Sequence, residues 1–278
     1  MNPSATAGPL IRPTVGVVIR FKNSAGTLPA VLNALAAQTN PPDLILGVNS
    51  GSTDASPTLL RAAGAQLVDW TAPYHHSKVL NFALRHCPTD LVLVLSSHTV
   101  LETPDAVAQM VAALADPRTA CVSCRWDDDL FYSAAVDWQE LQAKGLKFGA
   151  IYSNSMGMLR RSLWEKAPFD ETTITMEDGM WALDQIKHGH ICRRLKLPFS
   201  YQRSGHARDY LFAVITFQLA ARHNLRVAWL GVNGSLRDWF TTILRRLRGE
   251  PVDLKAAKAR RQRLCAWFTW RFVHPTKE

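Results

Sequence analysis

Short, wholly apolar runs alternate with segments of helical spacing through the first hundred residues. The runs are Val15–Ile19, Leu44–Val48 and Leu91–Leu95. Between the first two, leucine and valine recur at the spacing of one helical face, at Leu28, Val31, Leu32 and Leu35. Strands that are apolar without interruption are typical of a parallel sheet covered by helices on both faces. The sequence therefore predicts an α/β fold with a Rossmann-like, mostly parallel central sheet flanked by helices.

The same patterns predict the remaining elements and three regions. Helices are expected from Ser56 to Gly64, from Ser77, from Thr103-Pro104, around Ala134–Lys147 and from about Glu177 to Lys187; strands are expected at Gln66–Val68, at Thr119–Cys124 and near Ser153–Leu159. We expect residues 1–13 to be an N-terminal extension, residues 14–210 to form the main domain, and residues 211–278 to form a helical, basic and aromatic C-terminal region.

Polar segments follow three of the predicted strands. They are Arg20–Asn23, Asn49–Asp54 and Ser96–Thr99. In open sheets of this kind, ligands bind beyond the carboxyl ends of the strands. We therefore expect these three segments to line one crevice.

Most of the net charge lies in the last forty residues. From Arg237 to Glu278, eleven Lys or Arg oppose four acids, so this stretch supplies +7 of the total of +9. Such a local excess argues against a nucleic-acid footprint over the whole surface and favours a local anionic partner, such as lipid head groups or a phosphorylated carrier. Trp239, Phe240, Trp267 and Phe268 lie among the basic residues, which fits a membrane surface. The alternative is a helix packed on the main domain.

The N-terminus and the cysteines bear on the compartment. The first residues show no signal-peptide pattern, and Leu211–Gly231 is too polar to span a bilayer. The five cysteines are irregularly spaced, which predicts no disulfide framework and a reducing compartment. We expect a cytoplasmic protein, bound peripherally to the inner face of the membrane.

Three cysteine and histidine patterns suggest metal sites at first sight. Cys121 and Cys124 are three residues apart in a predicted strand, so their side chains should face opposite sides and cannot share a metal. The pairs His75-His76 and His188-x-His190 have no acidic or cysteine partner nearby in the sequence. We interpret the cysteines as core residues and these histidines as surface or loop residues.

A series of segments, taken in order, resembles the family 2 glycosyltransferases of the GT-A fold. The segments are Val15–Asn23, Leu44–Asp54, Lys78-x-x-Asn81, Leu91–His98, Met158–Trp164 followed by Pro168–Glu171, and Glu177-Asp178-x-x-Trp181-Ala182. They extend from about residue 14 to 210. The resemblance implies an inverting enzyme of the hexosyltransferase class. It would transfer a sugar from a nucleotide diphosphate to a hydroxyl of a glycan or a lipid-linked acceptor.

The resemblance also implies which residues do the chemistry. A single displacement at the anomeric carbon needs one carboxylate to deprotonate the acceptor hydroxyl and positive charge to stabilise the leaving diphosphate. Asp178 matches the family's base and Glu177 its neighbour. The alternative is that Thr175 and Asp178 form a capping box at the start of a helix.

The chain departs from the common family pattern at the metal site. Ser96-Ser97-His98 stands where many members carry Asp-x-Asp. His98 would then be a metal ligand, with His206 as a second, and imidazole suits Mn²⁺ better than Mg²⁺. Alternatively, His98 hydrogen-bonds the donor and His206 is an ordinary loop residue. The chain is similar to a subset that combines Arg-x-Lys-Asn after the first strand with Ser-x-His here.

Further residues are expected to bind the nucleotide-sugar donor. Arg20 and Lys22 follow the first strand, and Lys78 opens a helix, so all three are placed to meet a diphosphate. The donor set also includes Asn49, Asp54 and Ser97. Asn49 replaces an acid that often helps to hold the nucleotide. The sequence therefore does not predict which nucleobase the donor carries. Alternatively, the basic residues are solvent-exposed loop residues without a ligand. Asp54 could instead cap the helix that follows it.

Two other classes of protein compete with this interpretation. One is a non-catalytic relative that binds a nucleotide sugar or a glycan, because the chain lacks Asp-x-Asp. The other is a nucleotidyltransferase of similar architecture, which would need a glycine-rich loop after the first strand. Arg20–Asn23 contains no glycine.

Overall fold

The structure is a computed structural model that describes residues 12–125, 130–147, 151–173 and 175–201. Beyond these it describes residues 215–216, 218–220, 222–226, 243–245 and 247–248. The predicted boundary at residue 210, most of the N-terminal extension and most of the C-terminal region therefore lie outside the described residues. No helix in the described part of the chain is long and apolar enough to cross a membrane.

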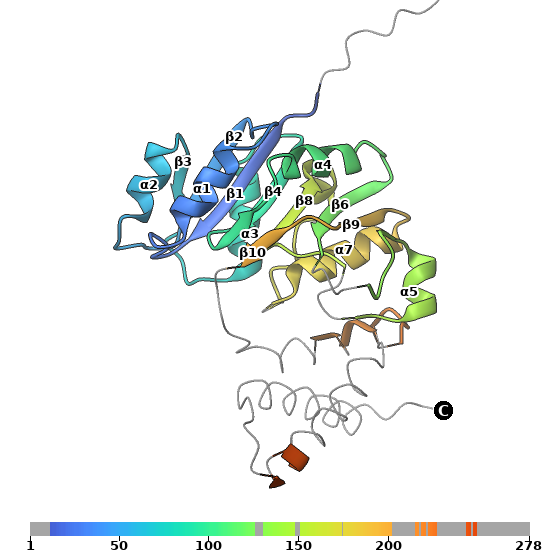
Figure 1. Cartoon of the computed structure of the whole chain (residues 1–278). Helices are drawn as coiled ribbons and strands as arrows, with labels where there is room; N and C mark the ends of the chain where they lie inside the picture. Colours follow the sequence, from blue (N-terminus) through green and yellow to red (C-terminus); the bar gives the residue numbers. More distant parts are fainter. Residues whose placement is uncertain are drawn as a thin grey trace, which may run out of the picture.

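A mixed sheet of eight strands forms the centre of the described domain (Figure 1). In spatial order the strands are β3 (Gln66–Asp69), β2 (Leu44–Asn49), β1 (Val15–Phe21), β4 (Leu91–Ser96), β8 (Met156–Arg160), β6 (Thr119–Cys124), β9 (Ile191–Leu195) and β7 (Ala135–Val136). The first four are mutually parallel, whereas β8 runs antiparallel to both β4 and β6. A separate antiparallel pair joins β5 (Thr99–Leu101) to β10 (Phe199–Tyr201).

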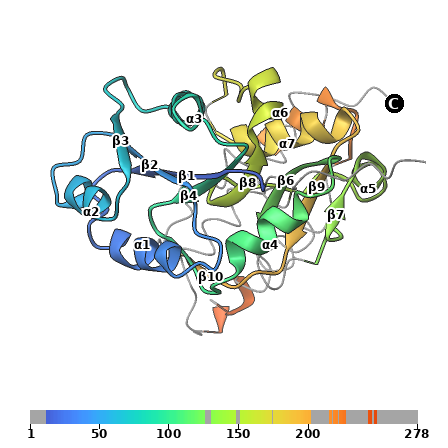
Figure 2. The same ribbon diagram turned by 90° about the horizontal axis from the view of Figure 1, so that it is seen from above.

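Helices cover both faces of this sheet (Figure 2). One face packs against α1 (Leu28–Ala36), α2 (Ser56–Ala62) and α4 (Ala106–Ala113). The other packs against α3 (His76–Arg85), α5 (Trp138–Lys144), α6 (Arg161–Lys166) and α7 (Glu177–Lys187). The buried strand residues alternate between the two cores: in β4, Leu93 belongs to the first and Val92 to the second. The predicted α/β architecture is therefore confirmed.

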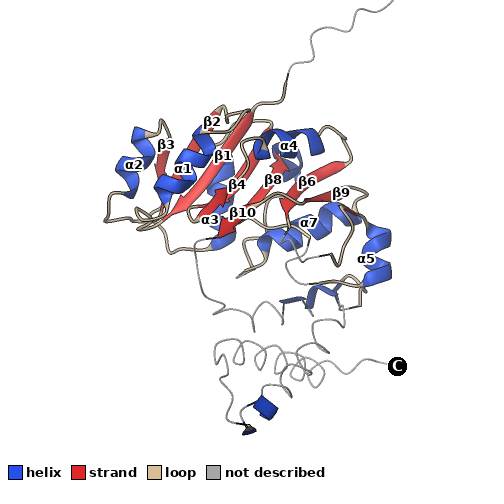
Figure 3. Ribbon diagram, viewed as in Figure 1, coloured by secondary structure: helices blue, strands red, loops and turns tan. Residues whose placement is uncertain are grey.

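One predicted helix is shorter than expected. In place of a helix around Ala134–Lys147, the chain forms the short strand β7 and then the shorter helix α5 (Figure 3). Asp137 fixes the start of α5, because its side chain accepts a hydrogen bond of 2.8 Å from the backbone N–H of Glu140. Gly145 ends the helix with a φ of 80°, which favours glycine. The residues before Asp137 are free to pair with β9.

The two cysteines of β6 lie on opposite faces, as predicted. Cys121 belongs to the core under α7, and Cys124 packs against the core under α1 and α4. The Cys121 and Cys192 sulfurs lie 3.0 Å apart on paired strands, as free thiols.

Asn81 ties the second helical layer together. Its amide nitrogen donates to the Phe169 carbonyl and to Glu171, both at 2.9 Å. Its amide oxygen accepts from the Trp164 indole at 3.0 Å and from the Phe169 N–H at 3.1 Å. The side chain thus links α3 to α6 and to the segment that leads to α7. A buried residue with four such bonds is structural, because loss of its side chain leaves several polar groups without partners.

Candidate active site

The three polar segments predicted to share a crevice do lie together at the carboxyl edge of the sheet. The hydroxyl groups of Ser24 and Ser97 are 2.9 Å apart, which joins the end of β1 to the turn after β4. Asn23 joins the end of β1 to the β2–α2 loop, since its side-chain oxygen accepts from the Thr53 N–H at 2.8 Å. Asn23 adopts a left-handed conformation with a φ of 49°. These bonds fix the edge on which the other site residues stand.

Two of the residues predicted to bind the nucleotide-sugar donor form hydrogen bonds within these loops. Asp54 accepts from the backbone N–H groups of Ala25, at 2.9 Å, and Ser56, at 3.0 Å. A hydrogen bond from the Ser56 side chain is the main reason that the pKa of Asp54 lies below its usual value, and the two backbone N–H groups lower it further. Asn49 donates to Asp69 at 2.9 Å and accepts a backbone N–H from its own loop at 2.8 Å. The side chains of Asp54 and Asn49 therefore stabilise the loops at the carboxyl edge of the sheet.

Arg20 projects from the end of β1 and meets the segment that opens α3. Its Nη1 donates to the Tyr74 hydroxyl at 3.2 Å and lies 3.3 Å from Nδ1 of His76. Because a guanidinium can only donate, Nδ1 of His76 is the acceptor in this contact. Lys78 is exposed in the first turn of α3, and Lys22 is exposed just after β1.

The structure places His75 in the loop before α3 and His76 at the first position of this helix. Both are half-buried, and they form the start of α3, with His75 at the N-cap. The ring of His76 contacts Tyr74 edge to face, with centroids 5.1 Å apart. His188 is exposed and contacts the Asp184 carbonyl in α7, whereas His190 is half-buried and contacts the Arg118 carbonyl before β6, as expected of loop residues.

The two acidic residues occupy the first turn of α7, but they do not form a capping box. Met176 stands at the N-cap with a φ of 64°, and no side chain caps the helix. The alternative role for Thr175 and Asp178 is therefore wrong. Instead, Asp178 accepts from the backbone N–H of Asn154 at 2.9 Å and from that of Gly179 at 2.7 Å.

The surroundings of Asp178 raise its pKa to about 7. Burial of the carboxyl group is the largest cause, and the negative charge of Glu177 is the second. The hydrogen bonds from Asn154 and Gly179 and the positive charge of Arg20 act in the opposite direction. Arg20 is thus close enough for its charge to act on Asp178, which brings the end of β1 and the start of α7 into one site. A carboxylate whose pKa is near neutral is suited to accept a proton.

The predicted metal ligands do not form a site within the described residues. Ser97 is buried, and its carbonyl accepts from the Thr27 hydroxyl at 2.6 Å. The His98 ring packs edge to face against Tyr201, with centroids 4.6 Å apart. His206 lies outside the described residues. In the described part of the chain, no three His, Cys, Asp or Glu side chains are grouped so that they could hold a metal.

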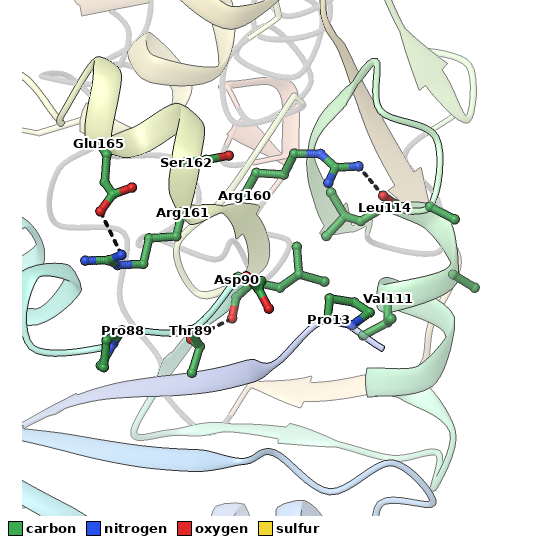
Figure 4. Close-up of a pocket in the computed structure, with 13 residues that line it drawn as sticks. Pro13, Pro88, Thr89, Asp90, Val111, Leu114, Arg160, Arg161, Ser162 and Glu165 are labelled. Carbon is green, nitrogen blue, oxygen red and sulfur yellow. Dashed lines mark hydrogen bonds and ion pairs between the residues drawn. The ribbon is translucent and has the colours of Figure 1, made fainter. Parts of the chain in front are cut away.

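A cavity of about 410 Å³ opens at the opposite edge of the sheet, where β4 begins and β8 ends (Figure 4). Its charged side chains are already paired. Arg161 bonds to Glu165 at 2.7 Å, Asp90 accepts from the Thr14 backbone at 2.8 Å, and Arg160 donates to backbone carbonyls. The two arginines that line the cavity are balanced in number by Asp90 and Glu165, so the cavity offers no excess of positive charge to a diphosphate, and we place the candidate active site at the carboxyl edge.

Comparisons with known proteins identify the family to which the chain is similar. A family model described as glycosyl transferase family 2 matches residues 16–169. The O-antigen chain rhamnosyltransferase RfbN of Salmonella typhimurium is 25% identical over an alignment of 199 residues that covers 63% of this chain. The chain spans 62% of the length of that relative.

Solved structures show the same fold. The mannosyltransferase PcManGT from Pyrobaculum calidifontis, in complex with GDP-Man and Mn²⁺, matches with a TM-score of 0.64 and 20% identity, over 99% of this chain and 80% of that one. The glucosyl-3-phosphoglycerate synthase from Mycobacterium tuberculosis, in complex with Mn²⁺ and UDP-Glc, matches with a TM-score of 0.59 and 17% identity, over 77% of this chain and 80% of that one. The architecture is therefore GT-A-like.

Proposed function

The chain belongs to glycosyl transferase family 2, and from this premise we propose that it is an inverting glycosyltransferase with Asp178 as its general base. It would transfer a sugar from a nucleotide diphosphate to a hydroxyl of a glycan or a lipid-linked acceptor. The observation that supports this proposal is the juxtaposition of Asp178, whose pKa is raised to about 7, with the positive charge of Arg20 at the carboxyl edge of the sheet. Carboxyl groups with strongly shifted pKa values cluster at catalytic sites, which favours an enzyme over a non-catalytic binding protein.

The proposed reaction is a single displacement. The acceptor hydroxyl gives its proton to the Asp178 carboxylate while its oxygen attacks the anomeric carbon. The bond from that carbon to the diphosphate breaks on the opposite side, so the configuration inverts. Glu177 acts indirectly, because its negative charge raises the pKa of Asp178 toward the working pH.

The leaving diphosphate gains one negative charge as its bond to the anomeric carbon breaks, and the site must balance this charge. Arg20 stands at the end of β1, with Lys22 close behind it in the sequence, and Lys78 is exposed at the N-terminal turn of α3. Helix N-termini also favour anions, because their backbone N–H groups are unpaired. We assign diphosphate binding to this basic group, and Ser97 and Asn49 shape the floor on which the donor rests.

Metal binding through His98 is the finer part of the proposal. PcManGT and the synthase are both described with Mn²⁺. Of the two expected ligands, only His98 lies among the described residues. Within these residues, no group of three His, Cys, Asp or Glu side chains that could hold a metal forms around it. We therefore derive the stabilisation of the leaving group from the basic residues. His98, with His206 outside the described residues, is the place to test for Mn²⁺.

The curated relative and the solved structures suggest which donors to test. RfbN is named as a rhamnosyltransferase, PcManGT binds GDP-Man, and the synthase binds UDP-Glc. We propose a hexose or a deoxyhexose as the transferred sugar, and a growing saccharide as the acceptor. The donor panel therefore contains activated rhamnose, GDP-mannose and UDP-glucose.

We also propose that the C-terminal region, residues 211–278, binds an anionic membrane surface and brings the enzyme to a lipid-linked acceptor. In its described part, Leu244 and Leu247 are 51% and 79% exposed beside Arg245 and Arg248. Exposed apolar side chains interleaved with basic ones fit the head-group layer. The aromatic residues Trp239 and Trp267 lie outside the described residues.

We expect Asp178→Asn to lower the transfer rate by about 10²- to 10⁴-fold while donor binding stays nearly unchanged, because the change removes the base and keeps its shape. In the wild type the rate should rise with pH through about 7, the pKa of Asp178, since the base must lose its proton to act. Initial rates across the donor panel at pH 5 to 9 measure both effects.

Glu177→Gln is the matched control for this experiment. It removes the neighbouring charge and keeps the base, so the acid limb of the pH profile should move to lower pH. Full turnover by Asp178→Asn would remove Asp178 from the mechanism. Donor binding without transfer across the panel would favour the non-catalytic relative.

Binding of UDP and GDP should survive a chelator and depend on Arg20. Arg20→Ala loses a charge-assisted hydrogen bond, which is worth about 1.5 to 3 kcal/mol, or about 10- to 100-fold in affinity. Arg118→Ala is the control, because Arg118 is exposed and pairs with Asp116 at 3.1 Å. Calorimetric titrations with and without EDTA measure the affinities. If EDTA abolishes binding, Mn²⁺ restores it and His98→Ala prevents the rescue, the metal carries the role that we give to Arg20.

The intact protein should sediment with anionic liposomes, and the bound fraction should fall as salt screens the attraction over a Debye length of about 8 Å at physiological ionic strength. Replacing both Leu244 and Leu247 by Glu should release the protein, since two exposed apolar contacts become negative charges. Leu130→Glu, at a residue that is 69% exposed elsewhere, should bind as the wild type does. Absence of the intact chain from the liposome pellet would rule out the membrane proposal.

A further inference from the structure

The guanidinium of Arg20, to which we assign the diphosphate, is held by two groups at the start of α3. Its Nη1 donates to the Tyr74 hydroxyl at 3.2 Å and to Nδ1 of His76 at 3.3 Å. Nη1 carries two hydrogens, so these two contacts use both of them. An imidazole that accepts at Nδ1 is neutral, because both ring nitrogens of the charged form are donors. Arg20 is therefore held by two neutral acceptors.

The remaining N–H groups of Arg20 lie on the opposite side of the guanidinium. Nε and Nη2 share the edge that faces away from Nη1, and this edge is the fork that binds a phosphate or a carboxylate through two parallel hydrogen bonds. Neither nitrogen donates a hydrogen bond to a described residue, and Nε is buried. A buried N–H without an acceptor is unfavourable. The arrangement therefore indicates a ligand with two acceptor oxygens at this edge.

The positive charge of Arg20 is not balanced by an acid in direct contact. Other arginines of the domain pair with acids: Arg12 with Asp43, Arg118 with Asp116, and Arg161 with Glu165. Within the described part of the chain, no carboxylate forms such a pair with Arg20. A carboxylate would fix the guanidinium but would also balance its charge. A hydroxyl and a neutral imidazole fix it and leave its charge available to an anionic ligand.

The two acceptors stand on a fixed frame. His76 is the first residue of α3, and this helix is bonded through Asn81 to the α6 layer. The Trp70 N–H donates to the Asn49 carbonyl at 2.8 Å, which ties the segment before α3 to the end of β2. The Tyr74 ring packs edge to face against the His76 ring, with an interplanar angle of 85°. His76 thus contacts Nη1 directly and also supports the ring whose hydroxyl makes the second contact.

We propose that His76 is a positioning residue for the diphosphate: with Tyr74 it holds Nη1 of Arg20, and so directs the Nε and Nη2 fork at the phosphate oxygens without reducing the charge of the guanidinium. This inference rests on the proposed function and deepens it by naming what orients its main cation. A fork that is already oriented in the free enzyme loses less side-chain entropy when the donor binds. It is also in place when the leaving diphosphate gains charge.

The two lysines of the basic group do not replace this fork. Lys22 and Lys78 are both exposed. A lysine ammonium is a compact charge on a flexible stem and has no planar fork, so it adds attraction without direction. Loss of the His76 acceptor leaves both lysines in place. It should therefore weaken diphosphate binding without abolishing it.

Binding of UDP and GDP to the full-length protein in the presence of EDTA tests the positioning role. His76→Phe keeps an aromatic ring against Tyr74 and removes the acceptor, and we expect it to weaken binding by about 2- to 10-fold. Tyr74→Phe removes only the hydroxyl and should have an effect in the same range. His86→Phe is the matched control at the other end of α3, where an exposed histidine contacts the Phe82 carbonyl. It should bind as the wild type does.

Two further variants separate the positioning of Arg20 from a purely structural role of the His76 ring. His76→Asn has no ring but places an acceptor oxygen near the position of Nδ1, and it should bind UDP and GDP as the wild type does. In the Arg20→Ala background, His76→Phe should cause no further loss, because the group that it positions is already absent.

Melting temperatures show which of these variants are folded. Among folded variants, unchanged binding by both His76→Phe and Tyr74→Phe would overturn the proposal. So would an equal loss from His76→Phe with and without the Arg20 side chain, or a loss in His76→Asn as large as that in His76→Phe.

A measurement without ligand makes the positioning of Arg20 testable apart from the donor. NMR spectra of the ¹⁵N-labelled protein report whether its guanidinium rotates about the Nε–Cζ bond, and Arg20→Lys identifies its signals. We expect separate Nη1 and Nη2 signals in the wild type, because Nη1 is held, and merged signals in His76→Phe. Fast rotation in the wild type would contradict the proposal.

The inference and the proposed function can fail separately. If the guanidinium is held as expected but Arg20→Ala binds UDP and GDP as tightly as the wild type, His76 still positions Arg20, and the assignment of the diphosphate in the proposed function falls. If Arg20→Ala weakens binding and His76→Phe does not, the proposed function stands and the positioning role of His76 falls.

Discussion

The Asp178 carboxyl group is buried beside a second carboxyl group, which makes its ionisation unfavourable. The rest of the site is arranged around this buried acid. Burial and the charge of Glu177 both oppose ionisation of Asp178, while two backbone N–H groups and the charge of Arg20 favour it. The balance puts its pKa at about 7. A carboxyl group at the surface of a helix would titrate near 4 and would be a poor base at neutral pH.

This placement requires a rigid edge, and the sheet provides it. Parallel strands bring their carboxyl ends to one side, and the loops that follow β1, β2 and β4 are cross-linked there by Asn23 and Ser24. The antiparallel strand β8 sits between β4 and β6, so the segment before it arrives at the same edge and carries Asn154 to the acidic pair. At the opposite edge, the basic and acidic side chains that line the cavity are equal in number, and Arg161 pairs with Glu165.

The sequence predicted most of this fold, because apolar strands and amphipathic helices each have a distinct period. It predicted the bounds of α7 at Glu177 and Lys187, and it predicted that three polar segments would meet at one edge. It failed around Ala134–Lys147, where cross-strand pairing to β9 and a cap at Asp137 override the helical pattern. It also could not show that His76 would meet Arg20, because that contact joins residues 56 positions apart. Asn154 lacked any signal, since a single polar residue before a strand is also common in turns.

We propose that a diphosphate lies against Arg20 at the carboxyl edge of the sheet, close to the Asp178 carboxyl group. A crystal structure of the full chain with a bound nucleoside diphosphate tests this claim most directly. We expect the diphosphate to contact the Arg20 guanidinium and the N-terminal turn of α3, with the Asp178 carboxyl group facing the space where the sugar would continue. A diphosphate bound instead between Arg160 and Arg161 at the opposite edge would contradict the account.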